Sequence, residues 1–469
     1  MRSRNRFVLL AVVLLAMLYC YGITSVGMLG PDEPRYAAIG RAMAQSGDWV
    51  TPRLWGQPWF EKPPLLYWMT AAATRAGFSQ DAAPRIPVAV TAIVFLIFFY
   101  FRVQKLFDEP VARYAAALLA TSAGWLAYGF VAVTDLPMSA TLCAALLLCL
   151  GEQPRAVWAG ILLGLAVLAK GLVPLVLFVP VIWWLRRRWR DLARVAVACL
   201  AIAAPWYALC TARNGTAFLT DFFWKHHFER FSSDVLAHGR PFWFFVPVLL
   251  AGLFPWTPML GLLGRHEVWK DTRLRFLVIW AAFGFVFFSA SYNKLPGYVL
   301  PLLPALCVAM GAALARMQQA RWWLLASGLL LILLPVIAVI LPRALIEGLS
   351  RAQVSAVPWG VALPFVVAAA GCWWLEGLGR REAALVILTF AIGGGVMWLK
   401  LFTFPRLDAL VSARHLWWRI APEADAICLD DIRRDWVYGL DYYAGRALPL
   451  CNEHPMPVRF HAGPITARR

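Results

Sequence analysis

The sequence predicts an all-α membrane protein that crosses the bilayer many times and carries a small α/β domain at its C-terminal end. Hydrophobic residues make up 61% of the chain, charged residues only 15%, and the mean hydropathy is +0.64. These values exclude an ordinary soluble domain. Apolar runs long enough to cross about 30 Å of hydrocarbon recur up to residue 402. We therefore expect a membrane domain over 1–402 and a separate domain over 403–469.

The apolar runs predict about 11–13 transmembrane helices. They lie near 7–29, 84–101, 112–130, 131–150, 156–170, 171–185, 193–210, 242–262, 276–291, 295–315, 322–341, 357–376 and 383–402. The two short runs that meet at Lys170 and Gly171 would also fit a hairpin or a re-entrant pair. The first run resembles a signal peptide at its basic start but reaches Leu29 without a small-residue cleavage site, so we expect an uncleaved helix.

The distribution of basic residues predicts the orientation in the membrane. A cytoplasmic N-terminus places nearly half of the 44 Lys and Arg in cytoplasmic segments, as the positive-inside rule requires. The net charge of +18 therefore mostly reflects topology, and we expect no nucleic-acid partner. The basic run from Arg186 to Arg190 fits a helix end held at anionic lipid headgroups.

The C-terminal segment ends up on the outer side in this topology. It reads as a strand over 426–429, a helix over 434–443 and a strand over 447–451, with Cys428 and Cys451 flanking the helix. An oxidising compartment would allow these two cysteines to form a disulfide, and the sequence leaves that question open.

Two outer loops, 28–84 and 211–241, are longer than connectors need to be and predict functional structure. In the first, a helix is expected to begin at Asp32 and to stop at Gly47. Ionisable side chains concentrate at this side of the membrane, where they cost free energy unless they pair or act. They are Asp32, Glu33, Arg35, Arg53, Glu61, Lys62, Asp135, His226, His227, Arg230 and Lys294.

Each of these residues also has a structural explanation. Asp32 could simply cap a helix, and Glu33 could favour its first turn. Asp135 could cap the span that follows it, and Lys294 could extend to the headgroups. The pair His226–His227 could lie at the headgroup interface rather than bind a metal.

Several segments together resemble a known family. They are Pro31 to Ala37, Ser46 to Trp49, Pro52 to Leu54, Phe60 to Trp68, Thr134 to Pro137, His227 to Phe231 and Lys294 to Pro301. In order and spacing they resemble the bacterial aminoarabinose transferases, which belong to the dolichyl-phosphate-mannose protein mannosyltransferase-like enzymes with the GT-C membrane glycosyltransferase fold. The resemblance covers the membrane domain up to about residue 315, and the C-terminal segment looks shorter than in those enzymes.

The resemblance implies transfer of a sugar from a polyprenyl phosphate, typically undecaprenyl phosphate, to an acceptor at the outer face of the bacterial inner membrane. The expected acceptor is lipid A or another envelope lipid or polysaccharide, and no nucleotide cofactor is implied. The catalytic candidates are Asp32, Asp135 and Glu33. The candidates for binding the donor phosphate are Lys62, Arg35, Arg230, Lys294 and Tyr298. Glu61 and His227 match positions that hold a divalent metal ion in a relative.

The implied chemistry suits these residue types. Departure of a phosphate needs charge neutralisation more than a general acid, which cations and a tyrosine can supply. In an inverting displacement, Asp32 would remove the proton of an attacking hydroxyl. If the acceptor is itself a phosphate, Asp32 would instead orient it or stabilise positive charge on the sugar ring.

Three other functions fit the topology. A lipid or sugar flippase would place ionisable residues near the bilayer midplane, whereas here they collect at the outer ends of the spans. A protein O-mannosyltransferase-like enzyme would share the site but use a protein acceptor. A membrane scaffold would not need the acids and bases of the first loop.

Overall fold

The computed structural model describes residues 2–222, 240–349, 351–354 and 356–461, with side chains from residue 10 onward. Up to residue 222, the helices outside the first long loop are α1 (Arg2–Cys20), α4 (Arg85–Leu106), α5 (Glu109–Ala120), α6 (Ala123–Phe130), α7 (Asp135–Cys149), α8 (Ala156–Lys170), α9 (Val173–Trp184) and α10 (Trp189–Leu219). From residue 240 to 402 they are η2 (Phe242–Phe244), α12 (Phe245–Gly252), η3 (Thr257–Gly264), α13 (His266–Lys270), α14 (Thr272–Ala290), η4 (Pro296–Val299), α15 (Leu302–Arg316), α16 (Arg321–Leu330), η5 (Leu331–Leu333), α17 (Leu334–Glu347), η6 (Trp359–Ala362), α18 (Leu363–Gly377) and α19 (Arg381–Phe402).

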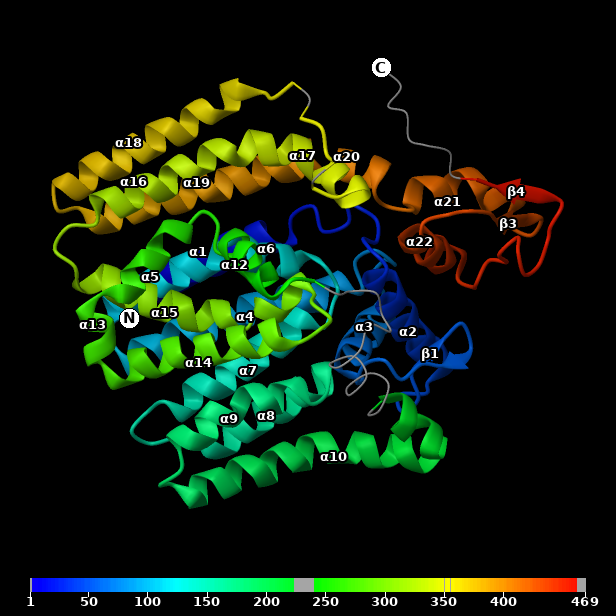
Figure 1. The fold of residues 1–469 in the computed structure, drawn as a ribbon, viewed down its shortest axis with the longest axis horizontal. Coiled ribbons are helices and arrows are strands. Elements are labelled where there is room, and N and C mark those ends of the chain that lie inside the picture. Colours follow the sequence, from blue (N-terminus) through cyan, green and yellow to red (C-terminus); the bar gives the residue numbers. More distant parts are fainter. Residues whose placement is uncertain (1, 223–239, 350, 355, 462–469) are drawn as a thin grey trace.

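The helices form three groups in Figure 1. Helices α16, α18 and α19 lie together at the top of the view, and α8, α9 and α10 lie at the bottom. Between them are α1, α4, α5, α6, α7, α12, α14 and α15. The first long loop and the C-terminal domain lie side by side at the right of the view, next to one end of the helices.

Among the described residues, six helical segments are long and apolar enough to cross a membrane, or seven if the bent pair Phe242–Gly252 and Thr257–Gly264 counts as one span. Five further apolar helices are shorter. One of them, α9, has 12 residues and is only about 18 Å long at a rise of 1.5 Å per residue. Most of the expected spans therefore exist as apolar helices, but several are short or broken.

Two of the breaks face each other. The run expected over 112–130 splits between α5 and α6, and α12 and η3 meet at an angle of 109°. The Ala123 backbone N–H donates to the Phe254 carbonyl at 2.9 Å, and the Trp256 indole N–H donates to Thr121 Oγ1 at 2.9 Å. Backbone groups that a broken helix exposes inside a membrane must find partners within the protein, and these two breaks supply each other's partners.

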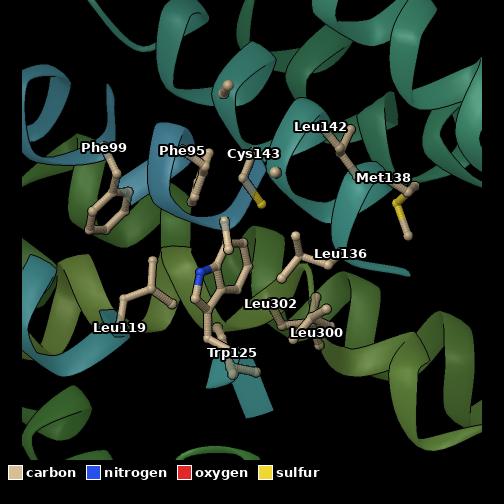
Figure 2. Packing of buried hydrophobic residues seen from close by; sticks show 14 of the residues in the cluster. Phe95, Phe99, Leu119, Trp125, Leu136, Met138, Leu142, Cys143, Leu300 and Leu302 are labelled. Carbon is tan, nitrogen blue, oxygen red and sulfur yellow. The ribbon is translucent and has the colours of Figure 1, made fainter. Parts of the chain in front are cut away.

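Close helix packing depends on small residues. A Cβ added at Gly160 of α8 would lie 2.4 Å from the Val195 carbonyl oxygen of α10, and one at Gly164 would lie 2.9 Å from the Cys199 carbonyl oxygen. This spacing of glycines lets two helix backbones approach. Large side chains fill the centre of the bundle, where Trp125 of α6 lies among Phe95 of α4 and leucines of α7 and α15 (Figure 2).

The first long loop folds into two helices and a small hairpin. These are α2 (Asp32–Ser46), β1 (Arg53–Leu54), β2 (Gln57–Pro58) and α3 (Leu65–Arg75), with β1 and β2 antiparallel. Helix α2 ends at Gly47, whose φ of 74° is the left-handed conformation that glycine favours. Asp32 does not cap α2, because it is the first helical residue and Pro31 occupies the N-cap position without a side-chain bond.

The chain after residue 402 forms a small domain with its own core. Its elements are α20 (Phe404–Leu410), α21 (Arg414–Ile420), η7 (Ala421–Glu423), β3 (Ile427–Leu429), α22 (Arg434–Ala444) and β4 (Val458–Phe460). Strand β3 pairs in parallel with β4, whereas the strand expected at 447–451 is reduced to a single bridge between Leu429 and Leu450. Cys428 and Cys451 form a disulfide, which closes the question that the sequence left open.

Candidate active site

Asp32 lies in a cluster of charged side chains from the first long loop. Arg35, one helical turn later, donates from Nη2 to Asp32 and from Nη1 to Glu61 Oε2 at 2.9 Å. Its Nε donates to the Pro31 carbonyl at 2.9 Å. Lys62 Nζ lies 3.5 Å from Glu61 Oε1. The Asp32 side chain is 36% exposed, against 6% for Arg35 and 8% for Glu61. Asp32 is thus the carboxylate of this cluster that remains open to another molecule.

Arg35 is held as a cation. Burial lowers its pKa, but the neighbouring carboxylates of Glu61 and Asp32 outweigh that effect and raise the pKa above its usual value. Aromatic rings surround its guanidinium at 5.9 Å (Tyr36), 5.6 Å (Trp59) and 5.0 Å (Tyr438) from Cζ to the ring centroid. The N–H edge of Arg35 is therefore already occupied by protein acceptors, which favours a role in orienting Asp32.

Glu33 lies in a different environment although it directly follows Asp32. Its carboxylate and the Arg85 guanidinium are both fully buried and are joined by two hydrogen bonds of 2.7 Å. The same carboxylate accepts the backbone N–H groups of Leu29 at 2.7 Å and Ala132 at 2.8 Å. With four hydrogen bonds and no exposed surface, Glu33 is out of reach of a substrate. This geometry favours a supporting role over the catalytic role predicted for it.

Arg85 also fixes the segment that leads into α2. Its Nη1 donates to the carbonyls of Ile23 and Val26, and its Nη2 donates to Gly27 at 2.8 Å. Backbone N–H groups of the same segment bind the C-terminal domain: Gly27 donates to Asp408 Oδ1 at 2.7 Å and Met28 to the Tyr443 hydroxyl at 3.0 Å. The start of α2 is therefore held from two sides.

Asp135 forms a second charged cluster with a lysine that the sequence analysis did not identify. Lys170 Nζ lies 2.5 Å from Asp135 Oδ1 and 4.8 Å from the centre of the Tyr298 ring. Their side chains are 15% (Asp135) and 9% (Lys170) exposed. A Cβ at Gly297 would lie 2.2 Å from Asp135 Oδ1, so only glycine lets this backbone approach the carboxylate. Asp135, like Asp32, is the first residue of its helix and not the N-cap. The N-cap of α7 is Thr134, whose side chain makes no capping hydrogen bond.

The two clusters belong to one site. The bond from Ala132 to Glu33 ties the residues just before Asp135 to the start of α2. Tyr128 experiences the charges of both Asp135 and Asp32, and a Cβ at Gly297 would lie 2.9 Å from its ring. The structure therefore places Asp135, Lys170 and Tyr298 close to the start of α2, where Asp32 lies.

Lys294 is buried beside the same loop as Tyr298. Its ammonium donates to the carbonyls of Ser291 and Arg240, the latter at 3.1 Å, and burial lowers the pKa of Lys294. It does not extend into solvent, which argues against the headgroup alternative. An ammonium has three donors, so these two bonds do not exhaust it.

The other candidates are Arg230 and the predicted metal site, and the structure does not describe all of their residues. Arg230, His226 and His227 fall in 223–239, which the structure does not describe. Among the residues it does describe, no three His, Cys, Asp or Glu side chains gather as a metal site would require. The oxygens of Glu61 face Arg35 and Lys62. The divalent metal ion at Glu61 and His227 stays a prediction.

Two apolar cavities are lined by residues that lie close in the sequence to members of the charged clusters. One, of about 550 Å³, is bounded by Leu29, Gly30, Phe130, Lys400 and Asp435, and so begins two residues before Asp32. The other, of about 650 Å³, lies between α8, α9 and α10. Its walls include Val167 and Leu172, on either side of Lys170 in the sequence. Both could hold long apolar chains beside polar chemistry.

Comparison with known proteins finds relatives of this chain. Residues 61–208 match the family model described as dolichyl-phosphate-mannose-protein mannosyltransferase. The chain is 30% identical to the undecaprenyl phosphate-alpha-4-amino-4-deoxy-L-arabinose arabinosyl transferase of Pseudomonas aeruginosa strain UCBPP-PA14, over 96% of this chain and 90% of that protein.

Solved structures share the fold. The crystal structure of ArnT from Cupriavidus metallidurans bound to undecaprenyl phosphate superposes with a TM-score of 0.75 at 24% identity, over 95% of this chain and 85% of that one. The Archaeoglobus fulgidus oligosaccharyltransferase superposes with a TM-score of 0.52 at 14% identity, over 93% of this chain and 63% of that one. The all-α fold expected from the sequence is thereby confirmed as the GT-C fold.

Proposed function

This chain belongs to the family of the undecaprenyl phosphate-aminoarabinose arabinosyl transferases, and on that premise we propose that it moves the sugar of an undecaprenyl phosphate-linked donor onto a lipid acceptor at the outer face of the bacterial inner membrane. It is a multi-pass membrane glycosyltransferase. The observation that carries the proposal is the pair of partly exposed carboxylates, Asp32 and Asp135, each held by its own cation in one region.

In this proposal Asp32 acts on the acceptor. Arg35 fixes the position of its carboxylate, and the exposed part of that carboxylate faces outward from the cluster. As the acceptor oxygen bonds to the anomeric carbon, the bond from that carbon to the phosphate oxygen breaks and its electron pair leaves with the phosphate. A hydroxyl acceptor gives its proton to Asp32. A phosphate acceptor has no proton to lose, and Asp32 then orients it or stabilises positive charge on the sugar.

The leaving phosphate gathers negative charge, which cations of the site neutralise. Lys170, Lys294 and Lys62 are the described candidates, and Arg230 remains a predicted one outside the described residues. Lys170 lies against both Asp135 and Tyr298, so it can hold the carboxylate and face the phosphate. Arg35 was predicted to bind the donor phosphate. Because its N–H groups bond to Asp32, Glu61 and Pro31, its proposed role is to orient Asp32.

The proposed topology places the N-terminus in the cytoplasm and the C-terminal domain in the periplasm. The positive-inside distribution supports it. So does the disulfide between Cys428 and Cys451, because disulfides persist in oxidising compartments. The test is an Arg446→Cys variant treated with a membrane-impermeant, cysteine-reactive biotin reagent. Labelling of intact cells would support the topology, and labelling only after cell lysis would contradict it.

The test is mass spectrometry of lipid A and total polar lipids from cells with the wild-type chain, without it, and with Asp32→Asn. A matched control is Asp425→Asn, a 95% exposed carboxylate in the C-terminal domain. We expect a mass increment in wild type and control that is absent from the other two strains. An increment that survives Asp32→Asn would reject Asp32 as the catalytic group and favour a flippase. Sugar on proteins with unchanged lipids would reject the lipid acceptor.

A further inference from the structure

Helix α22 of the C-terminal domain lies against α2 (Figure 1). It carries three tyrosines, Tyr438, Tyr442 and Tyr443. Arg41 of α2 donates to the Tyr442 carbonyl at 2.6 Å and lies 4.5 Å from the centre of its ring. Tyr443 accepts from Met28 and donates to Asp81 at 2.9 Å. Tyr438, one turn earlier, makes none of these docking bonds, and its ring lies over Arg35.

We propose that Tyr438 is a positioning residue that completes the active site from the C-terminal domain, by holding the Arg35 guanidinium that orients Asp32. This inference rests on the proposed function. It gives the C-terminal domain a role in the reaction, because Tyr438 would help to orient Asp32 through Arg35.

The case begins with how Arg35 is held. Its N–H edge donates to Asp32, Glu61 and the Pro31 carbonyl, so the plane of the guanidinium can be fixed further only by groups above and below it. Arginine is weakly hydrated and stacks favourably on aromatic faces. Of the three rings around it, Tyr438 is the nearest and is the one that does not belong to the first loop.

Tyr438 is also dispensable for the fold of its own domain. The core of that domain is formed by residues such as Trp436, Leu440 and Leu448, while Tyr438 is half-buried on the face toward α2. Docking of the domain is secured by Arg41, Tyr443 and the ion pair of Arg414 with Asp81 at 2.9 Å. Loss of the Tyr438 ring should therefore free Arg35 without releasing the domain.

The experiment uses purified full-length protein in detergent, with undecaprenyl phosphate-linked aminoarabinose as donor and lipid A as acceptor. It compares Tyr438→Phe, which keeps the ring, with Tyr438→Leu, which removes it, and with Trp418→Leu, an exposed aromatic of the same domain. We expect Tyr438→Leu to lower kcat about tenfold, an effect between those of an exposed and a fully desolvated cation–π contact, with donor KM within about twofold of wild type. Tyr438→Phe and Trp418→Leu should match wild type.

A merely structural role gives a different pattern. If Tyr438 acts through Arg35, Tyr438→Leu should cost nothing further in an Arg35→Lys background, because coupled sites are not additive. Equal losses in both backgrounds, a loss in KM alone, or a loss shared by Tyr438→Phe would each overturn the proposal.

A readout without turnover keeps the two proposals apart. Amide hydrogen exchange at Tyr36 to Ile39, whose N–H groups bond to the carbonyls of the first turn of α2, should rise in Tyr438→Leu and stay unchanged in Tyr438→Phe, and no rise would overturn the positioning role. Absence of transfer by the wild-type protein would count against the proposed function alone.

Discussion

Asp32 and Glu33 are adjacent acidic residues with opposite environments. Asp32 is bound by one arginine and leaves about a third of its side chain exposed, whereas Glu33 is fully enclosed by Arg85 and two backbone N–H groups. Successive residues on a helix point about 100° apart, so α2 turns one carboxylate toward the site and the other into the protein. A pair of acids in a motif can thus divide into one that reacts and one that holds the backbone in place.

The difference has an energetic meaning. Removing one partner of a buried, hydrogen-bonded ion pair leaves an uncompensated charge and costs about 3–5 kcal/mol. An exposed pair contributes about 0–1 kcal/mol. Mutations around Glu33 should therefore affect stability, and mutations around Asp32 should affect turnover.

The largest effect is expected from Arg85→Met. It leaves the Glu33 carboxylate buried without its cation, and we expect a loss of about 3–5 kcal/mol in unfolding free energy, measured by thermal unfolding of the detergent-solubilised protein. Arg446→Met, which breaks the exposed pair with Asp425, is the matched control and should change little. Equal effects from the two variants would remove the distinction between buried and exposed pairs.

Asp32→Asn should show the reverse behaviour. We expect turnover to fall about 10²–10⁴-fold, as when a general base is lost, with the melting temperature close to that of wild type. Glu33→Gln, compared in the same assays, should act mainly by lowering the melting temperature. A stable Glu33→Gln protein with no turnover would contradict the division of roles between the two acids.

Lys170→Met extends the comparison to the second cluster. It leaves Asp135 without its cation and removes a positive charge beside Tyr298, so we expect turnover to fall about 10–100-fold in the same assay. Lys170→Arg keeps the charge and should retain more activity. Full activity in Lys170→Met would show that Asp135 does not depend on this lysine.

The smallest effect on turnover is expected at Asp441 of the C-terminal domain, where a substitution should change the pH dependence of stability. Burial raises the pKa of Asp441 to about 7, although its bond from the Leu448 N–H acts in the opposite direction. The unfolded chain ionises near the ordinary aspartate value of about 4, so folding stability falls as the pH rises from about 4 to 7 and is constant above. Asp441→Asn should remove this loss.

The measurement for Asp441 is thermal unfolding at two pH values. The difference between a pKa of about 7 in the folded protein and about 4 in the unfolded chain corresponds to about 4 kcal/mol. We therefore expect Asp441→Asn to add up to about 4 kcal/mol of stability at pH 8 and almost none at pH 4. The same gain at both values would mean that packing, and not ionisation, explains the effect.

Local features were predictable from the sequence. Helix α2 begins and ends where Asp32 and Gly47 predict, and Asp135 lies at the start of an apolar helix. The helix α22 was predicted within a residue of its observed bounds. Each of these depends on neighbours within a few positions, which a single sequence displays.

Features that depend on distant partners could not be predicted. Asp32 was expected as a possible helix cap, but Arg35 takes its carboxylate. Three residues of the site gave no signal in the sequence because their partners are distant. Arg85 starts an apolar helix and bonds to Glu33, 52 positions away, and Lys170 ends a span and bonds to Asp135, 35 positions away. Tyr438 lies in the C-terminal segment, hundreds of positions from Arg35. Only folding brings these groups together, and the sequence carries no local signal for it.

The bonds that hold the segment before α2 can form only late in the synthesis of the chain. Gly27 and Met28 bind Asp408 and Tyr443, which follow them by 381 and 415 positions. At about 5–20 residues per second, the ribosome needs about 20–80 s to supply these partners. The start of α2 therefore gains these bonds only after nearly the whole chain has been made.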